Sequence, residues 1–317
     1  MKNILVMAAG AVGGYFGGLL SKNNNVVFIA RGEHLQVSKN KGLLIKSKNS
    51  GEFTAKGTFA SGTPQNYTAD LILFCVKEYH NDLAAEIVEP AIGEKTAIMT
   101  LQNGIGSADF LAKMFTSTQI IVGAAYVEAT KTEPGIIEEY GGDSLIKFGP
   151  HNTSTKSHLK MINVGNLLCE SGIPNQIIEK IDNVIWEKLI FISALSGMTC
   201  ITRSEFSEVI SNPMTKDMTW RLLNESYKVA TAAGAELPES TPSVIMENFI
   251  ATKDELVSSM HNDLKKGRPI EVKAINGAIS EIAKSLRTDA PINEIISTAL
   301  DIYDRKARIN IQGTKTL

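Results

Sequence analysis

The sequence predicts an α/β fold: an N-terminal domain with a doubly wound parallel sheet, followed by an all-helical C-terminal domain. Three observations lead to this prediction. Short apolar runs alternate with helix-like segments in the first half, a glycine-rich turn follows the first run, and strand-like runs almost vanish after about residue 182. We therefore expect domains at residues 1–180 and 181–317, within a chain long enough for two cores.

The apolar runs of the first half predict the strands of the parallel sheet. They are Ile4–Met7, Val26–Ile29, Leu71–Val76, Thr96–Leu101 and Ile120–Ala125. Helix-like segments such as Asp82–Val88 and Ser107–Met114 lie between them, as in βαβ units. Segment Thr132–Gly149 contains Pro134-Gly135 and Gly141-Gly142, and it predicts hairpin-like strands at the edge of the sheet.

Long helical patterns dominate the second half. They cover Val184–Thr199, Thr215–Ala233, Asp254–Lys265, Val272–Leu286 and Ile292–Arg308. The first is apolar on almost every face, which predicts a central, buried helix.

Composition and charge exclude several classes of protein. The chain is 43% hydrophobic and 21% charged, which is typical of a globular protein and excludes a disordered one. Its formal net charge of −2, from 32 basic and 34 acidic residues, provides no basic field for nucleic acid or an anionic membrane. The apolar N-terminus could pass for a secretion signal, but five glycines between Gly10 and Gly18 favour a folded strand and turn.

Cysteine and histidine usage points away from disulfides and metals. Cys75, Cys169 and Cys200 are odd in number, lack CxxC spacing and lie in or beside apolar stretches, so we expect buried, reduced thiols in a cytoplasmic protein. The five histidines show no metal-ligand spacing, so we expect no metal site and surface or loop positions for all of them. They are His34, His80, His151, His158 and His261.

The turn after the first strand resembles the dinucleotide fingerprint G-x-G-x-x-G. Gly10 and Gly13 occupy its second and third glycine positions, where a backbone can approach a pyrophosphate and a helix can pack on a strand. Ala8 replaces the first glycine, which would cost roughly 1 kcal/mol or more if the turn required a positive φ. The alternative is a glycine-rich turn without a ligand. The expected cofactor contacts in this turn are Ala8, Ala9, Gly10, Ala11, Val12 and Gly13.

Polar residues at the ends of later strands extend this predicted cofactor site. Arg31 stands 21 residues after Gly10, where an NAD enzyme usually has an acid for the ribose hydroxyls. Because a guanidinium can pair with a 2′-phosphate, the sequence favours NADP; the alternative is a solvated surface arginine. Lys77 and Asn103 also follow apolar runs, so they are candidates to line the cofactor cleft, although Asn103-Gly104 is equally typical of an ordinary turn.

Two charged residues of the second half are candidates for chemistry. Lys188 lies inside the apolar helix, where an ammonium is costly unless it is paired or faces a polar cleft, and where it loses its proton more easily. The alternative is a snorkelling lysine. Glu271 follows Gly267 and Pro269, so we place it in the first turn of a helix, where a carboxylate is favoured even without a catalytic role.

Together these segments resemble the ketopantoate reductase (2-dehydropantoate 2-reductase) family. The likeness spans nearly the whole chain in order and spacing. Its segments are the GAVGGYFG turn, Ala30–Leu35, Val76-Lys77, Leu101–Gly104, Trp186–Lys188, Ser258–Met260, Gly267-Arg268, Ile270-Glu271, Ile275–Gly277 and Ala290–Asn293. The resemblance implies a Rossmann domain joined to a helical domain like that of 6-phosphogluconate dehydrogenase. It also implies NADPH-dependent reduction of ketopantoate to pantoate, for pantothenate and coenzyme A synthesis.

The resemblance also implies roles for individual residues. Lys188 matches the general acid, Glu271 the carboxylate that grips the substrate, and Ser259 a hydroxyl near the substrate carboxylate. Asn103 matches a residue between cofactor and substrate, and Arg31 and Lys77 match cofactor contacts. The expected partner is a small 2-oxo acid, with a homodimer as one option for assembly.

Two positions depart from the family pattern. Ile192 and Ser196 stand one and two turns beyond Lys188, where the family's ketopantoate enzymes are expected to carry asparagines. Ser196 therefore joins the expected substrate contacts, and the alternative function is reduction of a different 2-oxo acid or an imine. A third hypothesis is a non-catalytic NADP-binding redox sensor.

Overall fold

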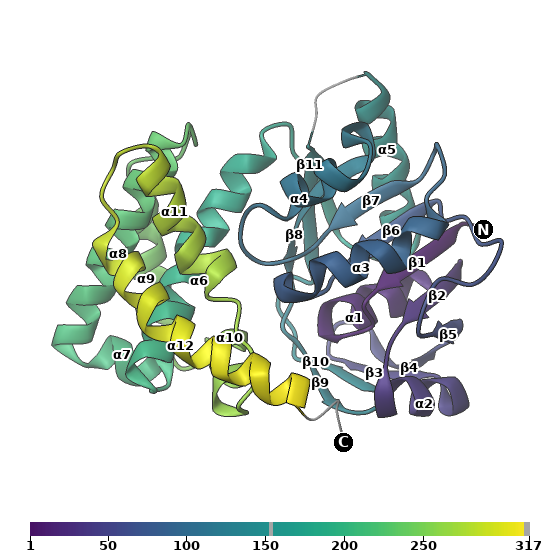
Figure 1. Ribbon diagram of the computed structural model, residues 1–317, viewed down its shortest axis with the longest axis horizontal. Coiled ribbons are helices and arrows are strands. Elements are labelled where there is room, and N and C mark those ends of the chain that lie inside the picture. Colours follow the sequence, from purple (N-terminus) through teal and green to yellow (C-terminus); the bar gives the residue numbers. More distant parts are fainter. Residues whose placement is uncertain (152–154, 314–317) are drawn as a thin grey trace. The chain divides into compact units, whose positions relative to one another are not determined.

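The computed structural model describes residues 1–151 and 155–313, which form two compact units (Figure 1). One unit comprises Met1–Gln102 and Ser107–Ile181; the other comprises Asn103–Gly106 and Asp182–Leu317, of which 314–317 lie outside the described residues. The first is built on sheets and the second is helical, so the predicted α/β fold class is confirmed.

The main sheet of the N-terminal unit has eight strands in the order β12-β11-β8-β7-β6-β1-β2-β5. The strands are β1 (Asn3–Met7), β2 (Asn25–Ile29), β5 (Thr58–Ala60), β6 (Leu71–Phe74), β7 (Ala97–Thr100), β8 (Ile120–Tyr126), β11 (Leu145–Pro150) and β12 (Asn175–Ile177). From β8 to β5 all neighbours are parallel, whereas β11 runs antiparallel to β8. This is the doubly wound order, and the direction of winding reverses between β1 and β6.

A second sheet of four strands lies in the same unit, in the order β4-β3-β10-β9. Its strands are β3 (Leu43–Ser47), β4 (Gly51–Ala55), β9 (Ala129–Glu133) and β10 (Ile136–Glu139). The expected hairpin is present as the antiparallel pair β9 and β10, but its placement at the edge of the main sheet was wrong, and β11, which does join that sheet, lies one strand in from the edge formed by β12. The reason is that β10 pairs in parallel with β3 and turns Ile137, which is fully buried, toward a helix rather than toward the main sheet.

That helix is α1 (Ala11–Leu20), and its glycines let it pack closely on both sheets. A methyl group at Gly17 would lie 2.7 Å from Val6 of the main sheet, and one at Gly14 would lie 3.0 Å from Ile137 of the second sheet. Gly13 and Gly18 repeat these contacts one turn away, with Val6 and Ile45 at 3.0 Å each. Since residues four apart share a helix face, each sheet meets a glycine-lined face of α1.

The other helices of this unit complete its layers. They are α2 (Gly32–Lys41), α3 (Asn81–Val88), α4 (Ser107–Met114) and α5 (Thr155–Glu170), with short 3-10 turns η1 (Glu78–His80), η2 (Glu89–Ala91) and η3 (Ser117–Gln119). The predicted helices at 82–88 and 107–114 are confirmed by α3 and α4.

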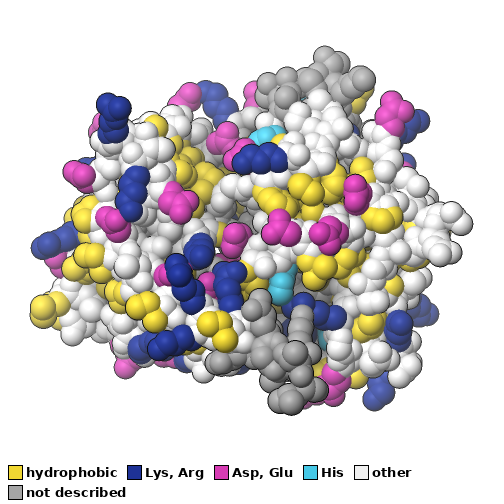
Figure 2. Space-filling view, viewed as in Figure 1, with side chains coloured by type: hydrophobic (Ala, Val, Ile, Leu, Met, Phe, Trp, Pro, Cys, Tyr) yellow, Lys and Arg dark blue, Asp and Glu magenta, His cyan; other side chains and the backbone are white. Residues whose placement is uncertain are grey.

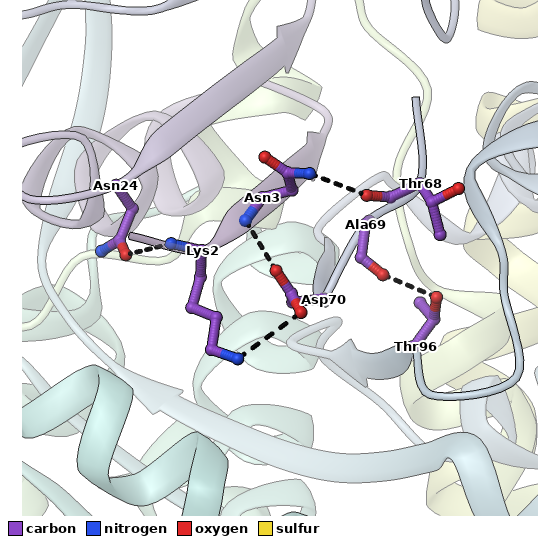
Figure 3. A network of polar contacts seen from close by, with 7 residues as sticks. All are labelled: Lys2, Asn3, Asn24, Thr68, Ala69, Asp70 and Thr96. Carbon is purple, nitrogen blue, oxygen red and sulfur yellow. Dashed lines mark hydrogen bonds and ion pairs between the residues drawn. The ribbon is translucent and has the colours of Figure 1, made fainter. Parts of the chain in front are cut away.

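The amino ends of strands β1, β6 and β7 are joined by their own polar residues (Figure 3). The Asn3 N–H donates to the Asp70 carboxylate at 2.8 Å, and the same carboxylate pairs with Lys2 at 3.6 Å. The Thr96 hydroxyl donates to the Ala69 carbonyl at 2.6 Å. Each of these polar groups thus has a hydrogen-bond or ion-pair partner at the same edge of the sheet.

The helical unit is organised around α6 (Ile181–Thr202). The others are α7 (Phe206–Ser211), α8 (Pro213–Ala232), α9 (Thr241–Thr252), α10 (Ser259–Lys265), a π-helical turn η4 (Lys273–Gly277), α11 (Ala278–Ser285) and α12 (Pro291–Gly313). In the described part of the chain, α6 alone is long and apolar enough to cross a membrane, but most of it is buried as the central helix predicted from the sequence. Basic and acidic side chains are intermixed over the face drawn in Figure 2.

Two expectations about individual side chains were wrong. Cys169 is exposed, because it lies on the solvent side of α5 while its neighbour Leu168 fills the core; Cys75 is half-buried and Cys200 buried. His34 and His261 are buried on the inner faces of α2 and α10, not on the surface or in loops.

Candidate active site

The strand register brings the predicted cofactor residues to one edge of the main sheet. Met7, at the end of β1, is level with Ile29 of β2 and with Phe74 of β6. The segments that follow these residues carry the glycine-rich turn, Arg31 and Lys77 respectively. In doubly wound sheets, ligands bind outside the carboxyl ends of the strands where the winding reverses, and that point here lies between β1 and β6.

The glycine-rich turn leaves open space at the start of α1. Helix α1 begins at Ala11 with Gly10 as its N-cap, and no atom lies within 4 Å of the position that a Gly10 side chain would occupy. A methyl group at Gly13 would lie 2.1 Å from the Ala8 carbonyl oxygen, so this glycine is required for the close approach of helix and turn. Ala8 is not among the described residues with positive φ, so alanine causes no left-handed strain there. The turn therefore fits a dinucleotide.

Arg31 and Lys77 provide positive charge at the same edge. Arg31 is exposed, and its guanidinium donates to His80 Nε2 at 2.8 Å, while Lys77 is half-buried at the N-cap of η1. Buried Gln102 supports this region, because its amide donates to the Val76 carbonyl at 2.8 Å and to Asn81 at 2.7 Å. His80 and Gln102 were not predicted as site residues, since only the fold shows that they lie beside Arg31 and Lys77.

His34 is a second residue that the sequence analysis missed. From α2 its Nε2 lies 2.7 Å from the Ala9 carbonyl oxygen, and its Nδ1 accepts from the Gly135 N–H at 2.8 Å. These partners define a neutral ring that carries its proton on Nε2. Burial lowers the pKa of His34, the Ala9 contact raises it, and Lys131 lowers it further, so the neutral form is favoured. No spacing in the sequence indicated these contacts.

The helical unit contains the predicted acid. Lys188 lies on α6 and is half-buried, and burial lowers its pKa to about 8, although the negative charge of Glu271 acts in the opposite direction. Glu271 itself is buried. The structure thus brings the two predicted catalytic residues within electrostatic reach of each other. A lysine whose pKa is close to neutrality can deliver a proton and recover it readily.

Glu271 is held by the elements around it. It precedes the π-helical turn η4, and its carbonyl accepts from the Ile275 N–H at 3.2 Å, close to the helix start predicted for it. The preceding Ile270 N–H donates to the carboxylate of Asp304 at 2.9 Å. Asp304 is fully buried on α12 and pairs with Arg308 at 2.7 Å. The backbone on both sides of Glu271 is therefore fixed.

The serine predicted to contact substrate is not the one that the structure places beside α6. Ser259 is exposed at the first position of α10, whereas Ser258 is its buried N-cap. The Ser258 hydroxyl accepts from the His261 N–H and donates to the Ser196 hydroxyl at 3.0 Å. Ser196 is also buried, and Ile192 lies one turn nearer Lys188. This face of α6 thus carries hydrocarbon next to the lysine, followed by two hydroxyls that bind each other.

Asn103 begins a short segment that packs with the helical unit. The Ile105 N–H donates to the Ala274 carbonyl at 3.3 Å. Gly104 has a φ of +92°, and a methyl group there would lie 2.3 Å from the same carbonyl oxygen. The segment is therefore part of the helical unit and is held against η4, close in sequence to Glu271. Across residues 1–151 and 155–313, no group of three or more His, Cys, Asp or Glu could hold a metal ion.

Comparison with known proteins defines the class. The pattern described as "Ketopantoate reductase PanE/ApbA" matches residues 4–153, and "Ketopantoate reductase PanE/ApbA C terminal" matches residues 180–304. The 2-dehydropantoate 2-reductase of Aquifex aeolicus is 28% identical over 247 residues, covering 76% of this chain and 78% of that protein. The uncharacterized oxidoreductase YkpB of Bacillus subtilis is 25% identical over 303 residues, covering 95% and 98%.

A solved structure agrees. The PanE/ApbA family ketopantoate reductase from Ralstonia eutropha JMP134 is 25% identical, with a TM-score of 0.87 over 96% of this chain and 99% of that one. The fold and the matches define an oxidoreductase built on a dinucleotide-binding domain and a helical domain. The chain belongs to the ketopantoate reductase family.

Proposed function

We propose that this protein reduces a 2-oxo acid to the corresponding 2-hydroxy acid with NADPH, with ketopantoate as the first candidate substrate and pantothenate synthesis as its role. The observation that carries the proposal is Lys188, an amine within a core helix whose pKa is lowered to about 8 beside buried Glu271. An acid tuned to this range suits protonation of a carbonyl oxygen at neutral pH. The family membership supports the same reaction class.

The N-terminal unit would bind the cofactor. The N-terminus of α1 and the space beside Gly10 suit the pyrophosphate, and Arg31 and Lys77 suit a 2′-phosphate. When bound, a reduced nicotinamide supplies the hydride. The exposed guanidinium of Arg31 supports NADPH over NADH, because an acid at that position would repel the phosphate. Cytoplasmic localisation remains part of this proposal.

The helical unit would supply the acid and hold the substrate. As negative charge develops on the carbonyl oxygen, the Lys188 ammonium stabilises it and transfers its proton to that oxygen. Glu271 keeps part of the lysine population charged, since it opposes the effect of burial on the lysine pKa, and it would accept a hydrogen bond from a substrate hydroxyl. Asn103 and Ser259 remain proposed contacts to the cofactor and to the substrate carboxylate.

A second candidate is a 2-oxo acid with a hydrocarbon side chain. Ile192 cannot hydrogen-bond a substrate hydroxyl, and Ser196 already accepts from Ser258. If Glu271 did not reach the substrate hydroxyl, that buried group would lack a partner at a cost of about 1–3 kcal/mol, which favours substrates without the hydroxyl.

One assay tests both candidates. NADPH and NADH oxidation would be followed with ketopantoate, with 3,3-dimethyl-2-oxobutanoate, which has the same skeleton without the hydroxyl, and with pyruvate. Preference for ketopantoate supports the first candidate, and preference for its deoxy analogue supports the second. Cofactor binding without turnover on any 2-oxo acid would instead indicate the redox-sensor hypothesis. In the Ile192→Asn variant, relative kcat/KM should move toward ketopantoate; Ile192→Val is the matched control.

A further inference from the structure

Ala9, the residue that leads into the N-cap of α1, is held through both of its backbone polar groups. The Ala9 N–H donates to the Ile29 carbonyl at 2.9 Å, and the Ala9 carbonyl oxygen lies 2.7 Å from His34 Nε2. Ala9 and His34 are both buried. The next residue, Gly10, is the N-cap of α1 and borders open space. The orientation of the Ala9–Gly10 peptide therefore depends on a side chain of another helix.

This orientation matters because a peptide group is planar. In a trans peptide the C=O of one residue and the N–H of the next point in opposite directions. A ring that fixes the Ala9 carbonyl therefore also fixes the direction of the Gly10 N–H. That N–H belongs to the second glycine of the fingerprint, whose backbone approaches the pyrophosphate.

His34 is itself fixed by the second sheet. The Gly135 N–H, in the turn between β9 and β10, donates to its Nδ1 at 2.8 Å. Gly135 has a φ of +80°, and a methyl group there would lie 2.5 Å from Val37, one turn along α2. Since the turn packs this closely on α2, its N–H holds the imidazole in one orientation and leaves the Nε2 proton for Ala9.

We infer that His34 is a positioning residue of the cofactor site: its ring holds the Ala9 carbonyl so that the Gly10 N–H is aimed at the pyrophosphate of the bound dinucleotide. The inference rests on the proposed function and adds to it the way in which the turn is kept ready for its ligand. Donors that are already oriented bind an anion more tightly, because no free energy of binding is lost in ordering them. His34 makes this contribution without touching the cofactor.

Two variants separate the two contacts of the ring. His34→Gln places an amide N–H near the position of Nε2 and can still donate to Ala9. His34→Asn places an amide oxygen near the position of Nδ1 and can accept from Gly135, but it is too short for Ala9. Full-length wild type and both variants would be titrated with NADPH and NADH, and the free energy of unfolding would be measured without cofactor.

The dissociation constants of both cofactors should rise about tenfold in His34→Asn, the size of one lost hydrogen bond, and stay within about twofold in His34→Gln. In His34→Asn the KM for NADPH should rise with the dissociation constant, and the turnover number at saturating NADPH should fall by a smaller factor. If cofactor affinity fell equally in the two variants, in proportion to their loss of stability, His34 would be merely structural and the inference would be overturned. Unchanged cofactor affinity in His34→Asn would also overturn it. If the wild type bound neither cofactor, the proposed function would fail with it.

Discussion

Glu139 is buried and Lys188 is half-buried, and their surroundings act on these two ionisable groups in opposite ways. Burial raises the pKa of Glu139, yet hydrogen bonds from Ser47, Asn49, Gly141 and Ser144 outweigh it and hold the pKa below its usual value. Burial lowers the pKa of Lys188 to about 8, and Glu271 offsets this only in part. The protein thus stabilises the charge of Glu139 and destabilises that of Lys188.

This difference separates a structural charge from a chemical one. The Glu139 carboxylate is 2% exposed and joins the β3–β4 turn to the end of β10, so its ionised form supports the fold. If a charged group is to donate a proton, its charged form must not be stabilised so completely. Substitutions at the two sites should therefore affect different quantities.

The largest effect is expected from Lys188→Met, which keeps the side-chain volume and removes the proton donor. Turnover should fall by about 10²–10⁴-fold, while NADPH affinity stays nearly unchanged. Steady-state kinetics and a cofactor titration measure the two quantities. Lys180→Met, directly before the first residue of α6, serves as the control. Undiminished turnover would remove Lys188 from the mechanism.

The next largest effect concerns Glu139→Gln. The amide cannot accept all the hydrogen bonds that the carboxylate accepts, so the free energy of unfolding should fall by about 2–4 kcal/mol at neutral pH. Because the pKa of Glu139 is lower in the folded than in the unfolded state, its contribution is present above the unfolded value and lost as the pH falls through the folded value. Denaturant titrations should show the deficit narrowing toward acidic pH; a constant deficit would contradict this account.

The pH dependence of the reaction should report the Lys188 pKa. The reduction needs the protonated amine, so kcat/KM should fall about tenfold per pH unit above a pH near 8. Oxidation of the hydroxy acid needs the neutral amine and should rise over the same range. A reduction rate that stays level up to pH 10 would show that another group is the acid.

Arg31 is an exposed charge, in contrast to Glu139 and Lys188. Replacing it with alanine should raise the KM for NADPH about tenfold and leave that for NADH nearly unchanged, because only the 2′-phosphate loses a partner. Its exposure predicts no measurable loss of stability. Equal effects on both cofactors would show that Arg31 does not discriminate between them.

The smallest expected effect is a gain in stability in Lys188→Met. Because the pKa of Lys188 is depressed, the unfolded state binds more protons between about pH 8 and its ordinary value of 10.5, so the wild type becomes more stable as the pH rises through this window. At pH values below this window the charge on Lys188 lowers the free energy of unfolding. Lys188→Met should therefore raise the free energy of unfolding by about 1 kcal/mol at pH 7. Thermal unfolding curves measure this; destabilisation would mean that the lysine is a structural charge like Glu139.

The sequence predicted the parts of the molecule that depend on local patterns. Apolar runs and glycine positions were enough for the parallel sheet, the turn at Gly10 and the central helix α6. The second sheet was missed because β3 and β10 pair across about ninety residues of chain, and such pairing leaves no local mark. Of the candidate site, Lys188 stood out as a charge in an apolar helix. His34 and Ser258 did not, because their roles come from partners that only folding brings close.

The segment Asn103–Gly106 belongs to the helical unit, although the chain on either side of it belongs to the other unit. The chain passes between them at Gln102–Asn103, at Gly106–Ser107 and again at Ile181–Asp182. A fragment that started at residue 182 would lack Ile105 and its bond to the Ala274 carbonyl, and a fragment that stopped there would retain a loop deprived of its support. The units are thus interwoven along the chain, and a cut between residues 181 and 182 would separate Ile105 from its partner Ala274.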